Sequence, residues 1–291
     1  MHVKNSNYRK CEVIGSSNAA RPEAAPAPPL GLPVAASQHM TEDAPPTAAM
    51  TGNDRAMSER DTTEPTSAGL VSAGVEMCST LPTYLSERYQ TWRSRRYAEN
   101  ATWYARLARD GQRPRAMIVS CCDSRLDSVA MFGAEPGDLF VVRNVANLIP
   151  PYNPDHSHHG TSAAIEYAVR NLRVAHIVIV GHSNCGGVEA CHQMCSGNAP
   201  ELAATGSFVG RWMDILRPAY ERTANASGTL EERLEALEKD AVRHSLDNLA
   251  GFPFVSEAVR GGLLSLHGAW VDIGAGKLFS LDPQDDRFVE V

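Results

Sequence analysis

Residues 175–187 read AHIVIVGHSNCGG, and this stretch decides the fold class. Its first half is a nearly continuous run of Ile and Val, which is typical of a strand buried on both faces of a parallel sheet. Similar runs occur at residues 116–120 (AMIVS) and 138–142 (DLFVV), and residues 161–172 between them and the third run suit a helix. The pattern predicts an α/β fold with a central, mostly parallel β-sheet flanked by helices.

The second half of the chain adds a long helix and a strand. Thr229 and Glu232 have the spacing of a capping box, so we expect a helix to begin there and to end at Gly251, shortly before Pro253. A last strand is expected over residues 269–273. These elements extend the same sheet rather than starting a second domain.

The N-terminal part of the chain divides into two regions. Residues 1–76 are rich in Ala and Pro and hold one aromatic residue, which predicts a disordered tail. Whether that tail is native, cleaved or a start-site artefact is left open by the sequence. Aromatic residues then recur at helical spacing over about residues 81–110, predicting an N-terminal helical arm that packs on the core or on a second subunit. We expect a single domain over residues 77–291.

Composition excludes several classes of protein. The 291 residues are 43% hydrophobic and 21% charged, as in an ordinary globular chain. A net charge of −7 argues against a nucleic-acid partner, and no apolar run is long enough to predict a membrane span. Seven cysteines are an odd number for a disulfide framework, so we expect free or metal-binding thiols and a cytoplasmic location.

Two of the predicted strands end in soft metal ligands. Cys121 follows the first strand, and His182 and Cys185 follow the third. Ligands gather at the carboxyl ends of parallel strands, so these side chains are candidates for one Zn²⁺ site with an open fourth position. The alternative is that both cysteines are buried thiols and His182 is an ordinary loop residue.

Four blocks of sequence bear on this choice. They are residues 120–126 (SCCDSRL), 135–147 (EPGDLFVVRNVAN), 165–169 (IEYAV) and 181–188 (GHSNCGGV). In this order and spacing they resemble the β-class carbonic anhydrases, over roughly residues 80–275. The resemblance implies a lyase that binds one Zn²⁺ per chain and reversibly hydrates carbon dioxide to bicarbonate and a proton.

The resemblance also implies roles for single residues. Cys121, His182 and Cys185 match the family's zinc ligands, and Asp123 and Arg125 match the catalytic pair that orients a zinc-bound hydroxide. Substrate-binding positions are matched by residues of four different segments: Gln112, Phe140, Val145, Tyr167 and Gly186. Part of this pocket is expected from a partner subunit, so the chain is expected to form a homodimer or a larger homo-oligomer.

One branch of the family has a closed site in which the aspartate binds zinc. That branch resembles a bicarbonate-regulated type with tryptophan three residues before the first cysteine ligand, where this chain has Ile118. Gln112 also matches the plant-like, open branch. We therefore expect Asp123 to be a metal ligand only in a closed state, and the open state to be the ordinary one.

Several alternatives and secondary features stay open. Hydrolysis of CS₂ or COS could use the same scaffold. Cys191, His192 and Cys195 repeat the ligand spacing, although a packed helix face is the simpler interpretation, and Cys122 is expected in the core. A further group could carry protons or form a solvated loop: His156, His158 and His159.

Overall fold

The structure is a computed structural model that describes residues 81–155 and 159–291. The predicted disorder of residues 1–76 and the side chains of His156 and His158 lie outside the described residues. From Glu87 onward the chain forms one compact unit. None of the described helices has the length and apolar character that crossing a bilayer requires.

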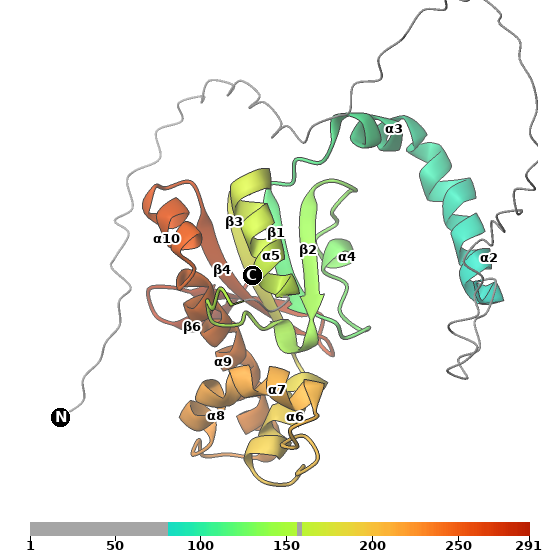
Figure 1. The fold of residues 1–291 in the computed structure, drawn as a ribbon. Helices are drawn as coiled ribbons and strands as arrows, with labels where there is room; N and C mark the ends of the chain where they lie inside the picture. Colours follow the sequence, from blue (N-terminus) through green and yellow to red (C-terminus); the bar gives the residue numbers. More distant parts are fainter. Residues whose placement is uncertain (1–80, 156–158) are drawn as a thin grey trace, which may run out of the picture. The chain divides into compact units, whose positions relative to one another are not determined.

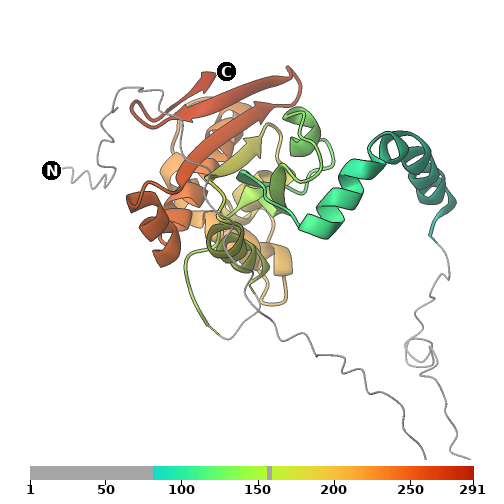
Figure 2. The ribbon, with the colours of Figure 1, turned by 90° about the horizontal axis from the view of Figure 1, so that it is seen from above.

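Six strands form one mixed sheet in the order β2-β1-β3-β4-β5-β6 (Figures 1 and 2). The first four strands in this order are parallel to one another. β5 pairs with β4 and with β6 in antiparallel fashion. The bounds are β1 (Ala116–Cys121), β2 (Leu139–Asn144), β3 (His176–His182), β4 (Ser265–Asp272), β5 (Lys277–Asp282) and β6 (Arg287–Glu290). The α/β class and the mostly parallel sheet are confirmed.

The predicted last strand is wrong in its start and in its place as the last one. We expected a last strand over residues 269–273, whereas β4 begins at Ser265 and is followed by β5 and β6. His267 and Gly268 break the apolar pattern that marks the other strands, so the start of β4 was not visible. β6 is an edge strand and β5 lies next to it; both are largely half-exposed or exposed, and their short pattern is weak in sequence.

Helices connect the strands and cover the sheet. The predicted helix over residues 161–172 is present as α5 (Gly160–Glu166) continued by η3 (Tyr167–Leu172). Before it lie α4 (Ser128–Met131) and η2 (Val145–Asn147). After β3 come α6 (Gly186–Cys195), α7 (Phe208–Met213), η4 (Asp214–Leu216), α8 (Arg217–Thr223), α9 (Leu230–Ala250) and α10 (Pro253–Arg260).

The long helix α9 begins where the capping box predicted. The Thr229 hydroxyl accepts from the Glu232 N–H at 3.2 Å, and the Glu232 carboxylate accepts from the Thr229 N–H at 2.7 Å. The helix contributes Leu237 to one buried cluster and Val242 to the other. It therefore bridges the two halves of the core and positions its own polar residues close to the strand ends.

The arm is helical, as predicted. It consists of α2 (Thr83–Trp92), η1 (Arg93–Tyr97) and α3 (Ala101–Asp110), none of which contains a buried residue. Within the arm, Trp92 contacts Tyr104 with ring centroids 5.8 Å apart, and Tyr97 contacts Tyr104 at 5.1 Å. The indole N–H of Trp103 donates to the Pro136 carbonyl at 3.0 Å.

Candidate metal centre

The parallel pairing of β1 and β3 brings the three predicted ligands together. Ser120 pairs with Val180, so the strand ends that carry Cys121 and His182 meet at one edge of the sheet. The two sulfurs of Cys121 and Cys185 lie 3.9 Å apart, and the possible ligand atoms of the three residues all lie within 4.8 Å of one another. Residues 61 positions apart in the chain thus form one cluster.

The donor atoms of this cluster fit a zinc ion. Cys121, His182 and Cys185 are 5%, 0% and 2% exposed. With its Nδ1 directed at the Ser183 carbonyl 2.9 Å away, His182 leaves Nε2 buried without a hydrogen-bond partner in the described part of the chain. An unpaired buried nitrogen is costly, whereas a metal ion would use that lone pair. Two sulfurs and one imidazole are a donor set that Zn²⁺ prefers.

The closeness of the two thiols shifts their pKa values in opposite directions. The pKa of Cys121 falls to about 4, chiefly because the Cys185 thiol hydrogen-bonds to the Cys121 thiolate. The pKa of Cys185 rises for the same reason, with burial adding to the rise. A divalent cation bound between the two sulfurs would favour deprotonation of both.

A carboxylate faces the cluster from the loop after β1. Arg125 grips Asp123 with its backbone N–H, its Nε and its guanidinium NH₂, at 2.9, 2.9 and 2.7 Å. The guanidinium also donates to the Asn184 carbonyl at 2.9 Å, which ties the pair to the loop of Cys185. Asp123 Oδ2 lies 4.0 Å from His182 Nε2. Hydrogen bonds from Arg125 hold the Asp123 pKa well below its ordinary value.

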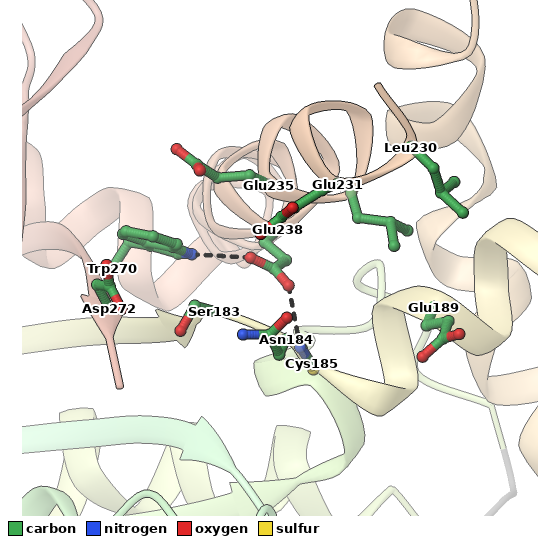
Figure 3. Close-up of a pocket in the computed structure, with 11 residues that line it drawn as sticks. Ser183, Asn184, Cys185, Glu189, Leu230, Glu231, Glu235, Glu238, Trp270 and Asp272 are labelled. Atoms are coloured by element: carbon green, nitrogen blue, oxygen red, sulfur yellow. Dashed lines mark hydrogen bonds between the residues drawn. The ribbon is translucent and has the colours of Figure 1, made fainter. Parts of the chain in front are cut away.

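Glu238 supports the cluster from behind and was missed by sequence reasoning. It is 4% exposed, accepts from the Cys185 backbone N–H at 2.9 Å and from the Trp270 indole at 3.3 Å (Figure 3). Burial raises the pKa of this carboxyl. A signal was available, because Glu238 lies four residues from Leu234 and Val242 on the apolar side of α9.

A hollow of about 500 Å³ opens beside Glu238 on the α9 side of Cys185 (Figure 3). Several carboxylates line it, among them Glu189, Glu231 and Glu235. Neither Asp123 nor Arg125 contributes to its lining. This hollow is therefore separate from the side on which Asp123 faces the ligands, and its negative charge disfavours an anion.

Arg143 and Asn144 fix the loops around the cluster. Arg143 donates to three backbone carbonyls of the first ligand loop, those of Cys121, Asp123 and Leu126, at 2.7 to 2.9 Å. Asn144 exchanges two hydrogen bonds of 2.8 Å with the backbone of Leu148. Sequence reasoning noted that the second strand runs into these two residues but gave neither of them a role.

The next segment approaches the cluster in an unusual backbone conformation. Ala146 and Asn147 both have positive φ, at 63° and 49°, and Ala146 is fully buried. A Cβ added at Gly187 would lie 2.7 Å from Val145 Cγ1 and 3.0 Å from Ala146 Cβ, so the close approach requires glycine. The Trp212 indole donates to the Val145 carbonyl at 2.8 Å and holds the segment from α7.

Other predicted pocket residues lie away from the cluster. Gln112 is exposed and precedes β1, whose length of about 17 Å separates it from Cys121. Phe140 stands beside Met117, nearer the start of the sheet, and contacts Tyr167 with ring centroids 5.9 Å apart. Within one chain, only Val145 and Gly186 of the five pocket positions lie close to the ligand loops.

The secondary features divide in the same way. Cys122 is exposed, so its expected place in the core is wrong: β1 ends at Cys121, and side-chain alternation stops there. Cys191 and Cys195 lie on α6 with sulfurs 3.9 Å apart, and Cys191 is buried, as a packed helix face predicts. His159 is paired with Asp155 at 2.7 Å.

Fold and cluster together define an α/β protein with a Cys₂His zinc site at the carboxyl edge of a mostly parallel sheet. Residues 116–278, more than half of the chain, match the family described as carbonic anhydrase. The chain belongs to this family. It is 36% identical over 188 residues to beta carbonic anhydrase 5, chloroplastic, of Arabidopsis thaliana, aligning 64% of this chain with 60% of that protein's length.

Solved structures agree with this assignment. The β-carbonic anhydrase CcaA superimposes with a TM-score of 0.64 at 30% identity, covering 72% of this chain and 91% of that one. One of two tetrameric β-carbonic anhydrases from Sordaria macrospora gives a TM-score of 0.59, also at 30% identity, over 68% of this chain and 95% of its own. The residues that match the family, 116–278, include Cys121, His182 and Cys185.

Proposed function

We propose that this chain is a carbonic anhydrase that reversibly hydrates carbon dioxide to bicarbonate and a proton, with Cys121, His182 and Cys185 holding the zinc ion. The observation that carries the proposal is the unpaired, buried Nε2 of His182 between two thiols and beside an arginine-held carboxylate. Two thiols that only pack in a core would not account for the unpaired His182 Nε2 or for the Asp123 carboxylate beside it.

When bound, zinc lowers the pKa of a coordinated water from about 15.7 to about 7 and so supplies hydroxide near neutral pH. The protein's own residues would do the rest. Asp123 stays ionised because Arg125 stabilises its charge, and its Oδ2 is the oxygen nearest His182 Nε2. From there it could accept a hydrogen bond from the nucleophile and so fix the direction of the attacking lone pair.

Arg125 has a positioning role in this proposal. Its bond to the Asn184 carbonyl keeps the guanidinium between the two ligand loops, and its fork to Asp123 keeps that carboxylate off the metal. Asp123 would join the ligands only if this fork opened. The geometry therefore supports the open form that Ile118 and Gln112 predict.

We further propose a homodimer or larger assembly that completes the pocket. We infer that Gln112, Phe140 and Tyr167 line the site of a second copy, because Gln112 and Phe140 lie away from the ligand end of the sheet and Tyr167 contacts Phe140. The exposed aromatic residues of the arm, including Tyr89 and Trp92, offer an apolar surface for that contact. The Sordaria proteins are named as tetrameric, which is compatible with such an assembly.

The cytoplasmic location remains a prediction. The five described cysteines are all free, which fits a reducing compartment. The Arabidopsis relative is named as chloroplastic, so location within the family is not uniform.

Stopped-flow CO₂ hydration at about pH 8.5, with zinc content measured on the same sample, tests the function. Rapid hydration with one zinc per chain, lost in Asp123→Ala while zinc is retained, is the expected result. Stoichiometric zinc without hydration between pH 7 and 9 would overturn the proposal and direct attention to CS₂ or COS.

A further inference from the structure

A second group of metal-binding side chains lies at the opposite end of the sheet. His176 Nδ1 lies 2.7 Å from Ser265 Oγ and 3.3 Å from His267 Nε2, and Ser265 Oγ lies 3.0 Å from His267 Nε2. The two imidazole rings are 5.4 Å apart at an angle of 54°. Three donor atoms thus lie within 3.3 Å of one another.

The sheet fixes this arrangement. His176 and Ser265 are register partners at the starts of β3 and β4, and His267, two residues along, points to the same face as Ser265. Backbone hydrogen bonds hold the strand starts, from the Ser265 N–H to the Ala175 carbonyl at 3.0 Å and from the Ala175 N–H to the Arg115 carbonyl at 2.9 Å. The ligands would be preorganised by the backbone rather than by a flexible loop.

We propose that His176 and His267, assisted by the Ser265 hydroxyl, form a second transition-metal site, with Zn²⁺ or Cu²⁺ as the ion. Tetrahedral zinc with bonds of about 2.0–2.1 Å to nitrogen places two ligating nitrogens about 3.3–3.4 Å apart. The observed separation of the facing ring nitrogens is 3.3 Å. Imidazole is a preferred ligand of both ions.

Charge also favours a metal ion over two protons. Partial burial and the neighbouring His176 lower the pKa of His267, which favours its neutral form. A neutral imidazole has a lone pair that a cation can bind. His267 remains exposed at the surface, which gives an ion a route from solvent.

This site would be weaker than the first and independent of it. In the part of the chain that the structure describes, no third His, Cys, Asp or Glu joins the pair in a metal-binding group, so water must complete the coordination. His176 and His182 are six residues apart on one strand, which separates the two sites by about 20 Å. The ion would connect strands whose ligands are 89 residues apart in sequence, and so stabilise the fold.

Calorimetric titration of the zinc-loaded protein with Zn²⁺ tests the proposal. One further equivalent is expected to bind with micromolar affinity, and the affinity is expected to fall at least about tenfold in His267→Asn and in His176→Asn. His159→Asn is the matched control, because His159 is another partly exposed histidine with a ring hydrogen bond. The His159→Asn variant should bind the second Zn²⁺ with the affinity of the wild type.

Copper provides a second readout. Electron paramagnetic resonance of the zinc-loaded protein with one equivalent of Cu²⁺ should show coupling to two imidazole nitrogens, reduced to one in His267→Asn. Absence of a further equivalent, or its loss in His159→Asn only, would overturn the proposal. In that event the three residues form only a hydrogen-bonded cluster. Carbon dioxide hydration does not enter either measurement, so the result is independent of the proposed function.

Discussion

The two ends of the parallel sheet carry histidines in opposite settings. At the carboxyl end, His182 is fully buried and its Nε2 has no hydrogen-bond partner in the described structure. At the amino end, His176 and His267 are more accessible, and each has the Ser265 hydroxyl as a partner. The same strand, β3, therefore holds a histidine whose buried nitrogen requires a ligand and one that is satisfied without it.

The difference shows what separates a permanent metal site from an exchangeable one. Burial makes an unpaired nitrogen expensive, and two adjacent thiols supply the charge that retains a divalent ion. An exposed pair of imidazoles forms only part of a coordination shell and competes with water and protons. We expect the carboxyl end to lose its ion only under harsh conditions and the amino end to exchange it freely.

The largest effect is expected from removing one thiolate at the carboxyl end. Cys185→Ala should lose stoichiometric zinc and reduce hydration by at least about three orders of magnitude, because acidification of water by the metal is lost. Metal analysis and stopped-flow hydration on one sample measure both quantities. His176→Asn is the comparison, and should retain the tight zinc and full hydration; equal losses in the two variants would contradict the difference between the ends.

The next effect separates holding the metal from using it. Asp123→Asn should keep one zinc per chain and lose about 10²–10³ in kcat, the usual consequence of removing one preorganised charge-stabilising group. Because Arg125 keeps the pKa of Asp123 low, the wild-type rate should show no inflection from this carboxylate between pH 6 and 9. Loss of zinc from Asp123→Asn would indicate a structural role instead.

A smaller effect is expected at the indole that supports the ligand loops. Trp212→Phe removes the donor to the Val145 carbonyl and should increase the rate of zinc loss to a chelator by about tenfold, the lower range for an outer-shell partner. Trp103→Phe is the matched control, because the Trp103 indole lies in the arm and also donates to a backbone carbonyl, that of Pro136. Similar rates of zinc loss in the two variants would exclude a specific role for Trp212.

The smallest effect concerns pH at the amino end. The folded pKa of His267 is below 6.5, so the unfolded chain binds more protons and stability declines as pH falls from 6.5 towards the folded pKa. His267→Gln should remove that part of the decline. The change in unfolding free energy is expected to be about 0.5 kcal/mol or less because the side chain is exposed to solvent. Urea titrations at pH 5.5 and 7.5, with chelator-washed zinc-loaded protein, measure this change. If the pH dependence of the unfolding free energy were the same in His267→Gln as in the wild type, the lowered pKa of His267 would be contradicted.

Local sequence carried much of this structure. The apolar run before Gly181 predicted β3, and the Thr229 capping box predicted the first turn of α9. Cys121, His182 and Cys185 could be proposed as one site because parallel strands end at a common edge. Glu238 and Trp212 could not be placed in the same way, since their contacts with residues 53 and 67 positions away depend on how α9 and α7 pack.

The sequence by itself determined the fold class and the ligand types, because strand patterning and short spacings act within a few residues. Its resemblance to the β-class carbonic anhydrases implied the roles of Asp123 and Arg125. Tertiary structure decided which side chains support the ligand loops, that Gln112 and Phe140 lie remote from their own chain's ligands, and that His176 meets His267. These are consequences of register and packing between distant segments. In the strands, a register shift of one residue would turn the side chains of His176 and His267 to the other face of the sheet.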